Sequence, residues 1–157
     1  IKLKNYWNDM TIVKIYKRNA KDFLPKYQTK GSAGVDLHAS LKEKEKLIEP
    51  NQRVLIPTGI YLSMPENIEA QIRPRSGLAL EKGITVLNSL GTIDPDYRGE
   101  LKVILINHSL KKQIIKNNMR IAQLVFCPII KISFLEVEEL DLTERSDKGF
   151  GFTGDKN

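Results

Sequence analysis

Many short apolar runs separated by turn-forming residues most limit the folds open to this chain. Val, Ile and Leu dominate the runs, and Pro, Asn or Gly stands in the gaps at 50–51, 57–59, 65–67 and 117–118. Short, closely spaced runs of β-branched residues favour strands, and many such strands favour a sandwich or a barrel. We therefore predict an all-β, jelly-roll-like domain with strands at residues 12–16, 34–39, 47–49, 53–57, 60–63, 68–72, 84–86, 101–107, 114–115, 120–128 and 131–136.

A single short helix is predicted at residues 76–82, where Ser76 heads an apolar stretch and Gly83 ends it. The length of 157 residues suits one domain, which we expect to span residues 11–142. Residues 1–10 are expected to be a disordered or misassigned extension, and residues 143–157 a flexible C-terminal arm.

Charge and hydropathy exclude two classes of partner. The net charge is +6, but residues 1–30 hold eight Lys/Arg and two Asp, and the remainder holds seventeen residues of each sign. The chain has no basic stripe interleaved with aromatic residues, so we expect no nucleic-acid partner. No apolar stretch approaches the ~20 residues that cross a bilayer, and no signal-like run begins the chain. We therefore expect no membrane partner and a cytoplasmic location.

The decapeptide from Gly91 to Glu100 is the strongest functional signal. It reads Gly-Thr-Ile-Asp-Pro-Asp-Tyr-Arg-Gly-Glu, and apolar runs at 86–87 and 101–106 flank it like the two arms of a hairpin. Such a turn can enclose a small flat ligand and present one carboxylate, Asp94, at its mouth. An ordinary acidic surface hairpin is the alternative.

Together with four other segments, this decapeptide resembles the motifs of the trimeric deoxyuridine triphosphatase (dUTPase) family. The other segments are, in chain order, 33–37, 74–79, 120–124, and Arg145 with 149–154. The resemblance runs from about residue 11 to residue 154. It implies a β-clip fold and a homotrimer with shared active sites. It also implies hydrolysis of dUTP to dUMP and pyrophosphate by water attack at the α-phosphorus, which removes dUTP from the DNA precursor pool and supplies dUMP for dTMP synthesis.

Arg75, Ser76 and Gly77 form the predicted seat for the triphosphate. A helix start presents free N–H groups to an anion, glycine permits close approach, and the arginine adds a full charge. The resemblance places the water-activating carboxylate at Asp94, and one positioned base contributes ~10²–10⁴-fold. Asp96 is expected to brace the turn.

The triphosphate calls for Mg²⁺, held mainly by phosphate oxygens and waters with no direct protein ligand. Asp36 would act through a metal-bound water or, alternatively, only cap the turn after Gly34. His38 and His108 stand alone in the sequence and are expected to be structural. Gln123 is a polar residue in an apolar strand and needs a specific partner, and the resemblance places it near the phosphates.

Recognition of the nucleoside is implied by the resemblance alone. Backbone groups of residues 99–102 would bind uracil, Asn88 would supply an amide, and Tyr97 would pack under the sugar and exclude a 2′-hydroxyl. The arm would bring Phe150 to the base and Arg145 to the γ-phosphate. The substrate-binding residues predicted in full are Arg75, Ser76, Gly77, Asn88, Thr92, Ile93, Asp94, Tyr97, Lys102, Arg145, Phe150 and Gly151, with Asp36 and Gln123 joining Asp94 in catalysis. Two residues of the arm depart from the family pattern: Phe152 replaces a small or polar residue, which bears on the arm's phosphate contacts, and Lys148 replaces the common Gly, which predicts a less flexible arm.

Two other functions are weighed against dUTP hydrolysis. A deoxycytidine triphosphate deaminase shares the fold, but it needs a proton-shuttling carboxylate on the strand after the hairpin, where this chain has Ile104. A non-catalytic, nucleotide-binding relative is the second alternative. A turnover assay with dUTP separates the two, and retention of the family's motif residues argues against this second alternative: Asp36, Ser76, Asp94, Tyr97, Gln123, Arg145 and Phe150.

Overall fold

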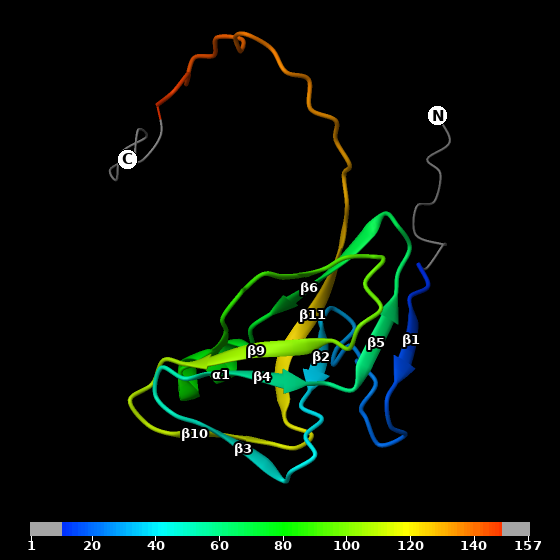
Figure 1. Cartoon of the computed structure of the whole chain (residues 1–157), viewed down its shortest axis with the longest axis vertical. Helices are drawn as coiled ribbons and strands as arrows, with labels where there is room; N and C mark the ends of the chain where they lie inside the picture. The colour runs from blue at the N-terminus through cyan, green and yellow to red at the C-terminus, as the bar shows by residue number, and fades with distance from the viewer. Residues whose placement is uncertain (1–10, 149–157) are drawn as a thin grey trace.

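The structure, a computed structural model, describes residues 11–148. Within this range the chain forms eleven strands and one helix (Figure 1). In chain order these are β1 (Lys14–Lys17), β2 (Val35–His38), β3 (Glu45–Ile48), β4 (Arg53–Pro57), β5 (Ile60–Ser63), β6 (Ile68–Arg73), α1 (Ser76–Lys82), β7 (Ile84–Val86), β8 (Gly91–Ile93), β9 (Lys102–Asn107), β10 (Gln113–Lys116) and β11 (Arg120–Pro128). The predictions for residues 1–10 and 149–157, including those for Phe150 and Gly151, lie outside the described residues.

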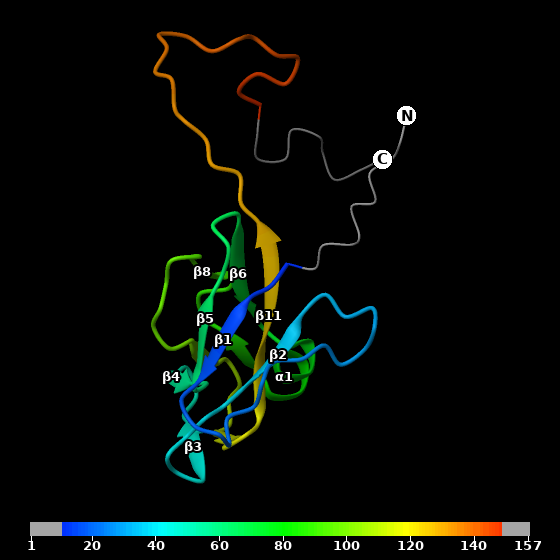
Figure 2. The same ribbon diagram turned by 90° about the vertical axis from the view of Figure 1, so that its right-hand side faces the viewer.

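All pairings between these strands are antiparallel. The largest sheet has the order β2-β11-β6-β8, a second has the order β4-β9-β7, and two pairs, β1-β5 and β10-β3, complete the domain (Figures 1 and 2). Each of these sheets is open, so the described domain is sandwich-like and not a closed barrel. The predicted all-β class with one short helix is confirmed.

One hydrophobic core joins the two larger sheets. It combines side chains of β2, β6 and β11 with side chains of β4, β7 and β9, among them Leu37, Ile72, Leu124, Ile56, Val86 and Leu105. On β9, buried Val103 and Leu105 alternate with partly exposed Ile104 and Ile106. This alternation follows from the two-residue period of side chains along a strand.

Asn107 is a polar residue buried beside this core, with no exposed surface. Its amide nitrogen donates hydrogen bonds to the carbonyls of Ile48 (3.0 Å) and Lys111 (2.8 Å). Its amide oxygen accepts from the backbone nitrogen (2.9 Å) and the hydroxyl (2.7 Å) of Ser109. A buried amide with four partners fixes the loop between β9 and β10 without an unpaired polar group.

The helix occurs where the sequence predicts it, at Ser76–Lys82, and it ends at Gly83 in the left-handed conformation (φ 63°). The Gly83 backbone nitrogen donates to the carbonyl of Ala79 (3.1 Å). The residue that caps the N-terminus is Arg75 and not Ser76, which is the first helical residue, and no side chain caps the start.

Two strand predictions are wrong. Residues 131–136 form no strand and their side chains are exposed, because no other described segment pairs with them. In contrast, Gly91–Ile93 form β8, which pairs with β6, although the sequence suggests that they belong to a tight turn. The hairpin arms are confirmed, since Val86 pairs with Leu105 in the β7–β9 ladder.

No helix in the described part of the chain is long and apolar enough to cross a membrane.

Candidate active site

Asp36 on β2 lies at the centre of a cluster of charged side chains. Its carboxylate is nearly buried and pairs with Arg75 Nε (3.3 Å) and Arg120 Nη1 (3.1 Å). Arg75 Nη1 also donates to the carbonyl of Arg120 (3.1 Å). Among the described residues these arginines, and no turn N–H, contact the carboxylate, so the geometry does not support the turn-capping alternative.

Gln123 completes this group, which we call the Asp36 cluster (Asp36, Arg75, Arg120 and Gln123). It lies opposite Asp36 in the β2–β11 ladder, and its Nε2 donates to the carbonyl of Pro74 (3.0 Å). A β-carbon on Gly34 would lie 2.7 Å from Gln123 Oε1, so glycine makes room for this amide. Gln123 therefore ties β11 to the segment that carries Arg75.

Ser76 and Gly77 are exposed at the start of α1, beside the Asp36 cluster. A β-carbon on Gly77 would meet no described atom within 4 Å. The chain's own packing therefore does not explain the glycine, whereas close approach of a ligand would. Arg120 is a member that the sequence analysis did not single out, although it heads one of the five motif segments.

A second group surrounds a cavity of about 310 Å³, the hairpin pocket, between β8 and β9. Of the residues predicted to bind substrate, five line it: Thr92, Ile93, Asp94, Tyr97 and Lys102. Leu55 and Glu100 also line it and were not predicted, although Glu100 closes the decapeptide. Asn88 is exposed and lies against Gly91, where a β-carbon would come 3.2 Å from the Asn88 amide nitrogen.

The turn after β8 is held by hydrogen bonds within its own segment. The Tyr97 backbone nitrogen donates to the carbonyl of Asp94 (3.1 Å), and the Tyr97 hydroxyl donates to the carbonyl of Glu100 (3.2 Å). Arg98 donates to the carbonyls of Pro95 (2.7 Å) and Tyr97 (3.0 Å). Among the described side chains Tyr97 and Arg98, and not Asp96 as predicted, therefore brace the turn.

The backbone groups of residues 99–102 are predicted to bind uracil, but those of Leu101 are already hydrogen-bonded within the fold. Its N–H donates to the carbonyl of Ile60 (2.8 Å), and its carbonyl accepts from the nitrogen (3.2 Å) and hydroxyl (2.6 Å) of Thr58. Both of its backbone groups are thus used inside the fold. Gly99, Glu100 and Lys102 remain candidates.

Asp36 and Asp94 lie at opposite edges of the four-stranded sheet. Asp36 is on edge strand β2, whereas Asp94 directly follows edge strand β8 (Figure 2). Three strand spacings separate the edges, ~14 Å. Ile93 pairs with Ala70 in the β6–β8 ladder, so Asp94 lies toward the start of β6, whereas Arg75 and Ser76 follow its end. A single chain therefore does not bring the predicted base to the predicted triphosphate seat.

The segment that follows β11 extends away from the domain (Figure 1), and Arg145 belongs to this segment. Its Nε donates to the carbonyl of Lys148 (2.9 Å), and its side chain is exposed. Apolar side chains of the same segment are exposed as well, including Phe134 (93%) and Leu142 (94%).

His38, next to the Asp36 cluster, stacks on Phe23 with ring centroids 4.7 Å apart. Its Nδ1 is buried and has no hydrogen-bond partner among the described residues. Burial lowers the pKa of His38 below 6.5, with Arg120 and Arg75 acting in the same direction and Asp36 opposing them. The folded protein therefore holds this imidazole neutral at a pH where an unfolded chain would protonate it.

The lowered pKa of His38 predicts a loss of stability in acid. Below about pH 6.5 the unfolded state binds more protons than the folded state at this site, so its contribution falls as the pH falls. We expect His38→Gln to reduce the decrease in melting temperature between pH 7.5 and pH 5.5, measured by calorimetry. His108→Gln, which removes an exposed imidazole, is the matched control. An unaltered pH dependence in His38→Gln would contradict this account.

Comparison with known proteins identifies the family of this chain. A dUTPase family model matches residues 20–154. The deoxyuridine 5'-triphosphate nucleotidohydrolase of Fusobacterium nucleatum is 55% identical over 131 residues, which cover 83% of this chain and 89% of that protein. The protein of the same name from Caldanaerobacter subterraneus is 53% identical over 148 residues, covering 92% of this chain and 99% of that protein.

Two solved structures share the fold. A variant dUTPase of Staphylococcus bacteriophage 80alpha with dUpNHpp has a TM-score of 0.83 at 24% identity, and the match covers 92% of this chain and 99% of that chain. A variant dUTPase from phage phi11 of S. aureus, in which a structural Mg(II) ion is coordinated, has a TM-score of 0.75 at 20% identity. This match covers 83% of this chain and 99% of that chain. Relatives more than half identical along most of their length show that the chain belongs to the dUTPase family.

Proposed function

We propose that this chain carries out its family's reaction, the hydrolysis of dUTP to dUMP and pyrophosphate, with Asp94 as the base. The observation that carries the proposal is the hairpin pocket, where Asp94 lies beside Thr92, Tyr97 and Lys102. The pocket of about 310 Å³ is of the size that small-molecule ligands occupy.

In this reaction Asp94 takes a proton from water as the water oxygen bonds to the α-phosphorus. The bond from that phosphorus to the bridging oxygen breaks, and pyrophosphate leaves. A carboxylate is a weak base, so its contribution of ~10²–10⁴-fold depends on placement. Positioning and neutralisation of the developing charge by Arg75, the start of α1 and Gln123 supply the remainder.

Mg²⁺ is the proposed cofactor, bound chiefly by phosphate oxygens and waters. The ion would neutralise charge on the triphosphate when bound. Asp36 fits a role through a metal-bound water, because its two carboxylate oxygens already pair with Arg75 and Arg120. If Asp36 bound Mg²⁺ directly, its ion pair with Arg75 or with Arg120 would be lost.

We further propose a homotrimer in which each active site is shared between chains. The ~14 Å between the sheet edges that carry Asp36 and Asp94 supports this arrangement, because two copies could bring opposite edges together. Arg145 belongs to a segment that leaves the domain, so it would approach a shared site separately from the two sheet edges that carry Asp36 and Asp94. We assign the reaction to the cytoplasm, where DNA precursors are made.

Tyr97 is the proposed discriminator between deoxyribose and ribose. Its ring is 44% exposed at the hairpin pocket, and its hydroxyl is fixed to the carbonyl of Glu100. We expect Tyr97→Ala to lower the ratio of kcat/KM for dUTP to that for UTP by about tenfold or more, because the steric wall is lost. Tyr97→Phe keeps the ring and should keep most of the preference. Equal ratios in wild type and Tyr97→Ala would refute the steric account.

A turnover assay tests the overall proposal against its alternatives. dUTP should yield dUMP and pyrophosphate, whereas a deaminase would release ammonia from dCTP and a binding protein would release neither product. The side chain of Ile104 on β9 cannot transfer a proton, and its carbonyl accepts a hydrogen bond from Leu87 (2.9 Å). The structure therefore gives deamination no proton shuttle at that position.

A further inference from the structure

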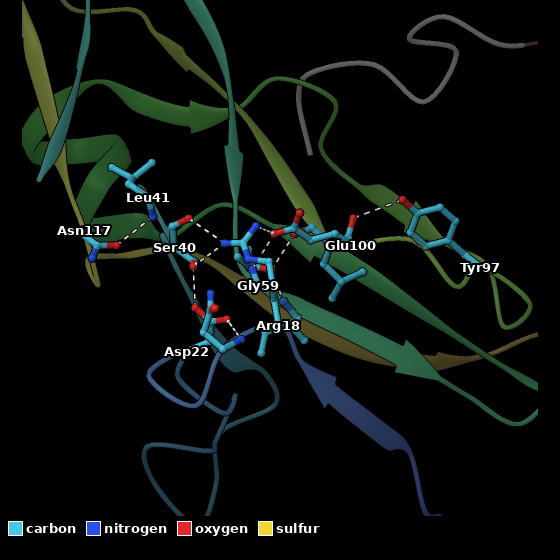
Figure 3. Close-up of polar contacts among 12 residues, drawn as sticks. Arg18, Asp22, Ser40, Leu41, Gly59, Tyr97, Glu100 and Asn117 are labelled. Atoms are coloured by element: carbon cyan, nitrogen blue, oxygen red, sulfur yellow. Dashed lines mark hydrogen bonds and ion pairs between the residues drawn. The ribbon is translucent and has the colours of Figure 1, made fainter. Parts of the chain in front are cut away.

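Glu100 lines the hairpin pocket, and its carboxylate is held by residues outside the pocket. It accepts a hydrogen bond from the backbone nitrogen of Gly59 (2.8 Å) and forms an ion pair with Arg18 Nη1 (3.0 Å) (Figure 3). The Glu100 side chain is only 10% exposed. A carboxylate this shielded from water depends on its cationic partner more than a surface carboxylate does.

Arg18 is in turn fixed from the side opposite Glu100. Its Nη2 donates to the Ser40 carbonyl (3.2 Å) and hydroxyl (2.8 Å), and the Ser40 hydroxyl donates to Asp22 Oδ1 (2.6 Å). The Arg18 backbone nitrogen also donates to the carbonyl of Gly59 (2.8 Å). The planar guanidinium therefore connects Asp22 and Ser40 with Glu100 across the end of the domain (Figure 3).

Through Glu100 this network reaches the turn that carries the proposed nucleoside contacts. The carbonyl of Glu100 accepts the Tyr97 hydroxyl, and Leu101 is bonded to Ile60 and Thr58. The far end of the turn is thus attached to the β4–β5 connection by the Glu100 side chain and the Leu101 backbone. Loss of one attachment would allow the Tyr97 ring and the 99–100 backbone to shift.

We propose that Arg18 is a positioning residue for nucleoside recognition, acting through the Glu100 carboxylate on the turn that carries Tyr97. This inference rests on the proposed role of the hairpin pocket as the nucleoside subsite. Arg18 lies outside the segment matched by the family model, which begins at residue 20. Its contact with Glu100 joins residues 82 positions apart in the chain.

The exposed ion pair between Lys112 and Glu49 (2.9 Å) provides a matched control. Its side chains are 65% and 45% exposed, and neither residue lines the hairpin pocket. Ion pairs this exposed contribute little to the free energy of folding. Arg18→Met and Lys112→Met each remove one cation from one ion pair, but only Arg18→Met releases the pocket wall.

The experiment compares KM, kcat, the dUTP-to-UTP ratio of kcat/KM, and the melting temperature of full-length variants. We expect Arg18→Met to raise KM for dUTP by about fivefold or more and to lower the dUTP-to-UTP ratio, with a smaller change in kcat. Lys112→Met should match the wild type. Arg18→Lys keeps the charge without the planar contacts and should recover part of the ratio.

The variant Glu100→Gln tests whether Arg18 acts through Glu100. If it does, the Arg18→Met/Glu100→Gln double variant should lose no more selectivity than Arg18→Met alone, because the shielded charge is then also removed. If Arg18→Met alone folds poorly, the double variant is compared with Glu100→Gln alone, from which its selectivity should not differ. Additive losses of selectivity would overturn the coupling.

A lower melting temperature with unchanged KM and unchanged selectivity in Arg18→Met would overturn the inference and leave Arg18 with a structural role. Tyr97→Ala in the same assay separates this failure from that of the proposed subsite. If Tyr97→Ala changes selectivity and Arg18→Met does not, only the role of Arg18 is wrong. If neither does, the subsite assignment is wrong, and the inference falls with it.

Discussion

Asp94→Asn should reduce kcat for dUTP by at least ~10², while the affinity for a nonhydrolysable dUTP analogue stays within a few-fold of wild type. The amide keeps the shape of the carboxylate but accepts no proton at neutral pH. Asp94 is exposed at the edge of the hairpin pocket, so the change should leave the fold intact. Single-turnover kinetics and calorimetric titration measure the two quantities separately.

Asp96→Asn is the matched control for this prediction. It removes an equally exposed carboxylate two residues away on the same turn. Its kcat should remain near wild type, since Asp96 does not line the hairpin pocket. Near-normal turnover in Asp94→Asn, or an equal loss in both variants, would remove Asp94 from the role of base.

Deletion of residues 146–157 should abolish most turnover and leave the melting temperature nearly unchanged. Residues 131–148 contribute no side chain to the hydrophobic core, and those described near Arg145 are exposed. The family resemblance assigns Phe150 and Gly151 to the substrate, so their loss should affect ligand binding and not folding. Thermal unfolding and steady-state assays of the truncated chain provide the measurement. A large drop in melting temperature would contradict this division.

Mixing the truncated protein with full-length Asp94→Asn tests whether active sites are shared. Each parent is expected to be nearly inactive, but a mixed trimer could combine Asp94 of one chain with the arm of another. Partial recovery after subunit exchange would support sites built between chains. Proven exchange without recovery would mean that each chain closes its own site.

The local elements of this fold were largely predictable from the sequence. The helix at Ser76–Lys82 was found because a short apolar stretch ends at Gly83, which adopts the left-handed conformation. Strand β8 was missed because its three residues begin with Gly91 and become a strand only through pairing with β6. The opposite error at residues 131–136 has the same cause, because a β-like pattern forms a strand only when a partner edge is present.

Five of the residues that line the hairpin pocket could be named from the sequence, but contacts between distant segments could not. The hairpin pocket gathers five residues from the motif resemblance, since they lie close together in the sequence. The ion pair of Asp36 with Arg120 joins residues 84 positions apart, and no local pattern marks it. The role of Glu100 was missed for the same reason, because its partner Arg18 lies on another segment.

The separation of the hairpin pocket from the Asp36 cluster also bears on inhibitor design. The arginines that would receive the triphosphate lie beside Asp36, after the end of β6 and at the start of β11, while the hairpin pocket lies beside edge strand β8 and is partly lined by apolar Leu55 and Ile93. An uncharged compound shaped to the pocket could therefore compete with the nucleoside without imitating the phosphates. Such a compound would avoid the high polarity that keeps phosphate mimics from crossing cell membranes.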